Sequence, residues 1–222
     1  MTEEEWLDAT NPEAMERLLV NTASPRKLRL YAVACCRRIW RLILSEEDRD
    51  AVAVAERLAD GLATNSERRT AVKRTSPSGQ SDRCIAAECA LAVDAAQAAV
   101  STADHAALAV GWEQSPFEYE LGVWGPAAEQ GKDREHAAQT GLLRDIFGNP
   151  FRPVTFDPAW RTRTAVSLAG QMYESRDFGA MPILADAIED AGCASDDVLD
   201  HCRGPGPHVR GCWVVDLVLG KE

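Results

Sequence analysis

Apolar side chains recur at spacings of three and four residues over residues 26–44, which predicts an amphipathic helix. Ser24-Pro25 supplies an N-cap and a proline that fits the first helical turn. Residues 30–36 are apolar on every side, so we expect neighbouring elements to enclose the middle of this helix. Its polar face is a stripe of arginines: Arg26, Arg29, Arg37, Arg38 and Arg41.

Further helices follow the same pattern. Ser45 and the acidic residues after it form a capped start for a helix that ends near residue 62. Residues 64–82 are polar and include Ser76-Pro77-Ser78-Gly79, which predicts a loop. Residues 83–110 form an alanine-rich helical stretch, and residues 111–131 mix Gly, Pro and aromatic residues, which predicts irregular structure. A helix resumes near residue 133 and ends before Gly148.

Prolines at 150, 153 and 158 exclude a helix over residues 148–158, which predicts an extended connector. Short helices are expected at residues 159–176, 182–191 and 195–202. The run 211–219 is β-branched, but no second strand is available to pair with it, so a buried helix is predicted. The fold class is therefore all-α. It comprises an N-terminal bundle (1–147), the connector (148–158) and a compact C-terminal helical unit (159–222), with short helices that permit a HEAT-like packing.

Charge and composition narrow the classes of function. The chain has 222 residues, a net charge of -11 and 45% hydrophobic residues, enough for a core. An acidic balance repels nucleic acid and anionic membranes. The first 74 residues hold 13 acidic and 13 basic side chains, so a basic face is conceivable only there.

The seven cysteines indicate a reducing compartment. They occur without a signal peptide, because the N-terminus is acidic where a signal is basic. No apolar stretch approaches the roughly 20 residues of a membrane span. We therefore expect a cytoplasmic protein with no membrane partner and reduced thiols, several of them core residues.

The segment 201–213 concentrates reactive side chains that a helical bundle does not need for folding. As metal ligands, its candidates are His201, Cys202, His208 and Cys212, with Cys193 as a further one, and zinc is the cofactor considered. The spacing matches zinc signatures poorly, since there is no Cys-x-x-Cys. As an anion site, the segment offers Arg203, His208 and Arg210 beside a helix start. The alternative is that the segment binds no ligand. In that case Gly-Pro forms a rigid turn, the cysteines belong to the core and the histidines form hydrogen bonds with backbone carbonyls.

Carboxylates give a second set of candidates. Asp216 lies inside an apolar run, where a buried carboxylate needs a partner. We favour a salt bridge to Arg203, Arg210 or the arginine stripe over a role as general base. Asp186, Glu189 and Asp190 share a helix face, which is more often a solvated acidic surface than acid–base machinery.

Three blocks of the sequence are long and specific: residues 26–40 (RKLRLYAVACCRRIW), 143–153 (LRDIFGNPFRP) and 201–221. These blocks resemble an uncharacterised bacterial family of planctomycete type. The resemblance implies no activity and no catalytic residue.

The sequence also lacks a Ser-His-Asp signature, a phosphate loop, a dinucleotide fingerprint and a His-Glu-x-x-His motif.

These observations favour a non-enzymatic interaction or scaffold module that binds a protein or a small anionic ligand. Its expected cleft contains Arg152, Arg203, His208 and Arg210, with Asp216 as a further candidate. The alternative is a metal-dependent hydrolase that uses His201, His208 and Asp216, with Asp186 or Asp190. A third hypothesis is nucleic-acid or anion binding through the arginine-rich surfaces. If the protein is a hydrolase, these candidate side chains should converge on one open pocket. If it is a scaffold, they should be dispersed or should satisfy one another's hydrogen bonds and charges.

Overall fold

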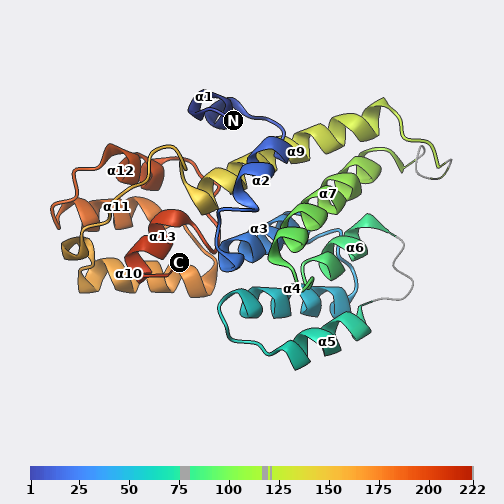
Figure 1. Cartoon of the computed structure of the whole chain (residues 1–222), viewed down its shortest axis with the longest axis horizontal. Coiled ribbons are helices and arrows are strands. Elements are labelled where there is room, and N and C mark those ends of the chain that lie inside the picture. Colours follow the sequence, from blue (N-terminus) through green and yellow to red (C-terminus); the bar gives the residue numbers. More distant parts are fainter. Residues whose placement is uncertain (76–80, 117–119, 121, 222) are drawn as a thin grey trace. The chain divides into compact units, whose positions relative to one another are not determined.

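The chain is helical throughout its described part, which confirms the predicted all-α class. The computed structural model in Figure 1 describes residues 1–75, 81–116, 120 and 122–221, and contains no strand among them. Two compact units result, residues 3–140 and residues 141–222. The division falls within α9 (Pro126–Phe147), so the last turns of that helix belong to the second unit. No helix in the described ranges is long and apolar enough to cross a membrane.

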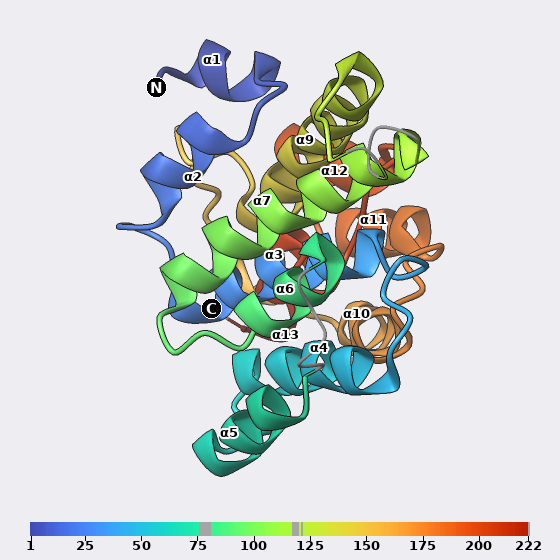
Figure 2. The same cartoon turned by 90° about the vertical axis from the view of Figure 1, so that its right-hand side faces the viewer.

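The first unit is built around α3 (Pro25–Arg38). All residues from 30 to 36 of this helix are buried, as predicted. It packs against α7 and α4, while α6 packs against α7 (Figures 1 and 2). The helix ends at Arg38, earlier than predicted, because turns replace it from residue 39. The other helices of this unit are α1 (Glu3–Asp8), α2 (Glu13–Leu19), α4 (Glu46–Ala59), α5 (Asn65–Arg74), α6 (Asp82–Cys89) and α7 (Ala95–Gln114).

The predicted loop over residues 64–82 is wrong for most of its length, because α5 occupies residues 65–74. A capping box starts this helix. The Glu67 amide donates to Thr64 Oγ1 at 3.2 Å, and the Thr64 amide donates to Glu67 Oε2 at 2.8 Å. The helix has few apolar residues, so the spacing of apolar side chains does not reveal it. The expected Ser76–Gly79 turn lies outside the described residues.

The stretch 83–110 is helical as predicted except at residues 90–94, where a break divides it into two helices, α6 and α7. Asp94 starts α7 by accepting a hydrogen bond from the Ala96 amide at 2.9 Å. Carbonyls of the break accept hydrogen bonds from Arg29, at 3.1 Å from Ala90 and 3.0 Å from Ala92. The irregular region predicted for 111–131 is shorter than expected, because α7 continues to Gln114 and α9 begins at Pro126.

The arginine stripe of residues 26–41 is engaged within the first unit in a network of intramolecular ion pairs. Its pairs are Arg26–Asp60 (3.0 Å), Arg37–Glu56 (3.3 Å), Arg38–Glu135 (2.8 Å) and Arg41–Glu113. Asp60, Glu56 and Glu135 have side chains that are only 2–4% exposed. Buried carboxylates of this kind require a cation, so the stripe serves the core of this unit.

The second unit has short helices around its own core. After α9, residues 148–157 are non-helical, in agreement with the predicted connector. The run 213–219 is a buried helix, as predicted. The elements are η1 (Pro158–Trp160), α10 (Arg163–Ser175), α11 (Met181–Glu189), α12 (Asp196–Arg203) and α13 (Trp213–Leu219). The core side chains include Ala169, Met172, Leu184, Ile188, Val198, Val214 and Val218. α10 packs against α13 and α11, and α11 packs against α12.

Helices α7 and α9 approach closely at two glycines. A Cβ atom on Gly131 would lie 3.0 Å from Gly111 Cα and 3.1 Å from the Val110 carbonyl oxygen. Backbone atoms cannot move aside as a flexible side chain can, so this crossing requires glycine.

Replacing Gly131 with alanine should therefore lower the free energy of unfolding by about 1–3 kcal/mol, since overpacking forces the helices apart. Chemical denaturation of the purified variant measures this change. The control is Gly170→Ala in α10, where a Cβ meets nothing within 4 Å. Helix propensity predicts a gain of about 0.5–1 kcal/mol for that control. Equal effects at both positions would contradict the close approach.

Glu16 is a buried carboxyl group that contacts a tyrosine. The Tyr31 hydroxyl donates to Glu16 Oε1 at 2.9 Å. Burial raises the pKa of Glu16 to about 7; the Tyr31 hydrogen bond lowers this pKa, and the negative charges of Asp104 and Glu13 raise it further. Glu16 therefore holds its proton more tightly in the folded chain than in the unfolded chain.

Stability should fall as the pH rises from about 4.5 through 7, because the unfolded state releases this proton first. With each pKa unit worth about 1.4 kcal/mol, ionisation of Glu16 should cost about 3 kcal/mol above pH 8. Glu16→Gln keeps an acceptor for Tyr31 and removes the ionisation. Unfolding curves across this pH range should thus diverge between wild type and variant. Parallel curves would show that Glu16 does not carry the dependence.

Candidate functional site

Four side chains of the second unit converge on one point: Asp145, His201, His208 and Cys212. One potential ligand atom from each lies within 4.8 Å of all the others. Asp145 is in the last turn of α9, and His201 is in α12. His208 lies in the loop after α12, and Cys212 is the N-cap of α13. Three of these residues were predicted as metal ligands, and Asp145 was not.

The carboxylate of Asp145 is the centre of the group. Its Oδ1 atom lies 2.9 Å from His208 Nδ1 and 3.2 Å from His201 Nε2. Its Oδ2 atom accepts a hydrogen bond from the Val209 amide at 2.9 Å. His201 Nε2 also lies 3.2 Å from Cys212 Sγ.

Two glycines of the segment after residue 140 allow this convergence. Gly141 lies under Pro207, whose Cδ would be 3.3 Å from a Cβ atom at that position. Gly148 follows the last residue of α9 and has a φ of +67°, a backbone conformation that favours glycine. A β-carbon at this position would lie 3.3 Å from the Trp213 ring. Trp213 in turn lies 5.1 Å from the His201 ring, measured between centroids. The turn after α9 therefore supports the tryptophan that contacts His201.

The site is mostly closed to solvent. The side chain of Asp145 is 2% exposed, that of His208 is 8% exposed and that of His201 is 19% exposed. Cys212 is fully buried. His208 Nε2 is also buried and has no hydrogen-bond partner within the described part of the chain. A buried nitrogen without a partner is costly, unless its lone pair or its proton is satisfied by a bound group.

Electrostatics distinguish the two acidic members. Burial raises the pKa of Asp145, but hydrogen bonds and charge from His201 and His208 outweigh it, so the pKa is lowered overall. Burial and then the Asp145 charge raise the pKa of Cys212 well above its usual value, against a smaller lowering by the Val215 and Val214 amides. Asp145 is thus ionised, and Cys212 is a thiol unless a cation stabilises its thiolate.

The geometry does not suit a Cys-His-Asp relay. A relay uses the two nitrogens of one imidazole, one facing the nucleophile and the other facing the carboxylate. Here His201 Nε2 faces both the thiol and the carboxylate, at 3.2 Å each. One nitrogen offers either a lone pair or a proton and cannot complete both bonds. Convergence of this kind is typical of ligands around a common cation.

The spacing is close to that of a tetrahedral zinc site. Zn–N distances of about 2.0–2.1 Å and Zn–S distances of about 2.3 Å place neighbouring ligand atoms about 3.3–3.7 Å apart. Three distances between ligand atoms here are 2.9, 3.2 and 3.2 Å, and every pair lies within 4.8 Å. Modest shifts of the side chains would bring the four atoms to the spacing around a zinc ion.

Two predicted members lie outside the group. Cys202 is buried in α12 next to His201 but is not among the four converging residues, whereas Asp145, which was not predicted, is one of them. Asp216 is buried in α13, where its amide donates to the Cys212 carbonyl, and it is not a member either. The hydrolase triad of His201, His208 and Asp216 is therefore not assembled.

The predicted arginines are engaged elsewhere. Arg203 binds Asp186 at 3.0 Å and Glu189 at 2.5 Å. Arg210 lies over the Tyr173 ring at 4.3 Å and 4.0 Å from Glu174. Arg152 is exposed in the connector. Asp186 and Glu189 are 71% and 50% exposed, so they belong to a solvated acidic surface, the alternative that the sequence favoured, and both contact Arg203.

Asp145 left a signal in the sequence that was missed. It lies between Leu142 and Ile146 in a helix, and both neighbours are buried. A carboxylate at helical spacing within an apolar face needs a partner. Asp216 was predicted to need a partner for this reason, and the same reason predicts a partner for Asp145.

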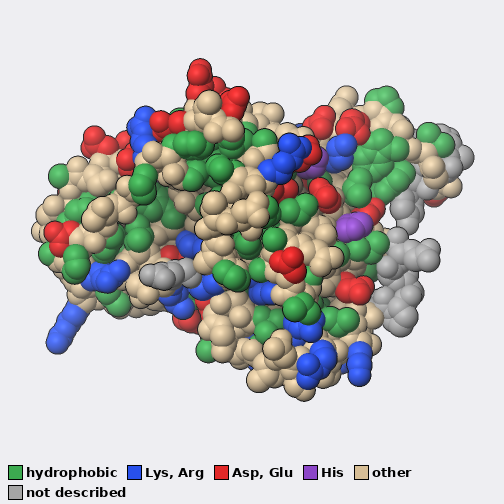
Figure 3. Space-filling view, viewed as in Figure 1, with side chains coloured by type: hydrophobic (Ala, Val, Ile, Leu, Met, Phe, Trp, Pro, Cys, Tyr) green, Lys and Arg blue, Asp and Glu red, His purple; other side chains and the backbone are tan. Residues whose placement is uncertain are grey.

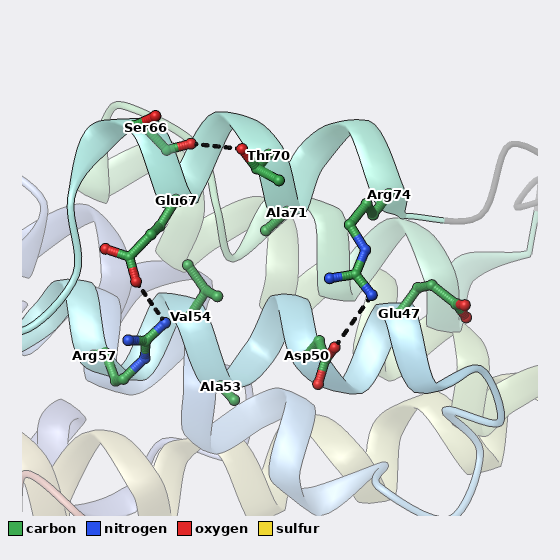
Figure 4. A pocket seen from close by; sticks show the side chains of 10 residues that line it. All are labelled: Glu47, Asp50, Ala53, Val54, Arg57, Ser66, Glu67, Thr70, Ala71 and Arg74. Carbon is green, nitrogen blue, oxygen red and sulfur yellow. Dashed lines mark hydrogen bonds and ion pairs between the residues drawn. The ribbon is translucent and has the colours of Figure 1, made fainter.

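The first unit offers a pocket and a basic surface. The pocket, of about 390 Å³, lies between α4 and α5 (Figure 4). Ion pairs Arg57–Glu67 (3.0 Å) and Arg74–Asp50 (3.6 Å) bridge it, and its described lining holds no histidine or cysteine. Lys and Arg side chains gather over α5 in Figure 3; this helix carries Arg68, Arg69, Lys73 and Arg74. Neither feature presents a set of catalytic or metal-binding groups.

No protein-family model, curated protein or solved structure matches this chain. The resemblance to an uncharacterised bacterial family stays a prediction.

Gly148→Ala should destabilise the protein by about 1–2 kcal/mol through its left-handed backbone alone. The contact with Trp213 should add to this cost. Gly220→Ala is the matched control, because Gly220 has the same φ of +67° and its Cβ would meet only ordinary contacts with Arg161. Urea denaturation of both variants isolates the Trp213 contribution. Identical losses would mean that Trp213 moves aside freely.

Proposed function

We propose that residues 141–222 bind one zinc ion through Asp145, His201, His208 and Cys212, and that the metal stabilises a non-enzymatic helical module. The observation that carries this proposal is the convergence of four ligand atoms within 4.8 Å of one another. Two imidazoles, one thiol and one carboxylate make a donor set of two nitrogens, one sulfur and one oxygen.

The donor set favours zinc over the common hard cations. Magnesium and calcium take oxygen ligands, whereas imidazole and thiolate suit zinc. A zinc ion would also supply the positive charge that Cys212 needs to become a thiolate in a fully buried position. The ion would replace the competing demands of Asp145 and Cys212 on His201 Nε2 with one metal bond for each group.

The number of ligands supports a structural role. Structural zinc sites have four protein ligands, whereas catalytic sites keep one position for water or substrate. Asp145 and Cys212 are buried, and His201 is the most exposed of the four at 19%. This arrangement supports the scaffold hypothesis over the hydrolase hypothesis. It also moves the proposed centre from the predicted arginine cleft to the metal.

Elemental analysis of native, untagged protein purified without chelator tests the proposal. We expect about one zinc ion per chain, since the four ligands form one closed site. His208→Ala and Cys212→Ser should lose most of the bound zinc. The matched control is Cys202→Ala, a buried cysteine next to His201 that lies outside the group; it should keep its zinc.

Cobalt substitution gives an independent readout of the ligands. Tetrahedral cobalt with a thiolate ligand has intense visible absorption and a sulfur-to-metal charge-transfer band. Cys212→Ser should abolish the charge-transfer band. A protein that takes up neither zinc nor cobalt, as purified or after titration, would refute the proposed function.

A further inference from the structure

The loop between two of the proposed ligands forms a strap, defined here as residues 204–209 (Gly-Pro-Gly-Pro-His-Val). It follows the end of α12 and leads to Cys212 at the start of α13. Pro205, Gly206 and Pro207 are exposed. The strap therefore buries little apolar surface, and burial of that kind is what holds most loops down.

The polar anchors of the strap meet on one carboxylate. His208 Nδ1 lies 2.9 Å from Asp145 Oδ1, and the Val209 amide donates to Asp145 Oδ2 at 2.9 Å. Pro207 adds a contact over Gly141. One side chain of α9 thus contacts two polar groups of the strap, beside the backbone hydrogen bonds at the strap's two ends, from the Gly204 amide to the Asp200 carbonyl and from the Cys212 amide to the Val209 carbonyl.

We infer that zinc at this site gates the strap, closing it when the metal binds and releasing it when the metal is removed. The inference rests on the proposed function and deepens it, because it makes zinc availability the regulator of a conformational change. His208 is the strap's own ligand, so metal binding fixes the strap directly. Opening would expose the Asp145 carboxylate and the Cys212 thiol.

The polar groups explain why the metal-free strap should open. Without a cation, His201 Nε2 cannot satisfy both Asp145 and Cys212. Buried polar groups that lack partners favour hydration. The glycines at 204 and 206 gain backbone freedom on release. Zinc reverses this balance by accepting the nitrogen and sulfur lone pairs.

Hydrogen exchange with mass spectrometry on the full chain tests the gate, with zinc-loaded and chelator-treated samples compared. The amides of residues 208–211 should exchange at least about tenfold more slowly with zinc, because exchange there requires local opening. Peptides from α10, which contributes no ligand, should change by less than about twofold. Zinc content is measured in the same samples.

Two variants in the strap separate ligation from loop composition. In His208→Ala, zinc should no longer slow the exchange of residues 209–211, since the strap has lost its ligand. The matched control is Pro205→Ala, an exposed strap residue outside the group, in which zinc should protect as in wild type.

The outcomes distinguish this inference from the proposed function. If zinc binds at the four residues but the strap exchanges equally with and without it, the gate is wrong and the zinc site stands. If no zinc binds, the proposed function fails, and the gate fails with it. Protection that persists when His208→Ala is incubated with zinc would likewise overturn the gate.

Discussion

The buried carboxylate of Asp145 is the constraint on which the second unit depends. At 2% exposure it needs partners, and these come from residues far along the chain. His208, 63 residues away, and the next amide, of Val209, bind its two oxygens. His201 approaches from α12. The need to satisfy one side chain therefore brings together the end of α9, the end of α12 and the loop that follows it.

The first unit meets the same constraint with different partners. Glu56 and Glu135 are buried beside Arg37 and Arg38, so their charges are balanced by the arginine stripe. Glu16 instead meets the hydroxyl of Tyr31, and burial raises its pKa to about 7. Asp145 and Glu16 show how the partner decides the pKa of a buried carboxyl group. Two imidazoles lower the pKa of Asp145 despite its burial, whereas the Tyr31 hydroxyl does not offset the burial of Glu16.

The four converging side chains at Asp145 favour the scaffold hypothesis over the hydrolase hypothesis. A hydrolase would need an open position on its metal, but four protein side chains already converge here. The arginines that suggested an anion-binding cleft have internal partners, Arg203 with Asp186 and Arg210 with Tyr173. Beside the group, residues 205–207 of the strap are exposed. The proposed metal would therefore bear on surface structure as well as on stability.

The sequence by itself determined the helical class, the start of α3 at Ser24 and of α4 at Ser45, and the segment that supplies three of the four converging residues. Each is encoded locally, by a cap, a proline or a spacing. Tertiary structure alone decided the break between α6 and α7, where Arg29 binds the carbonyls. It also decided the choice of Asp145 over Cys202. Neighbours in sequence point in different directions on a helix, and packing between distant segments selects which side chains meet.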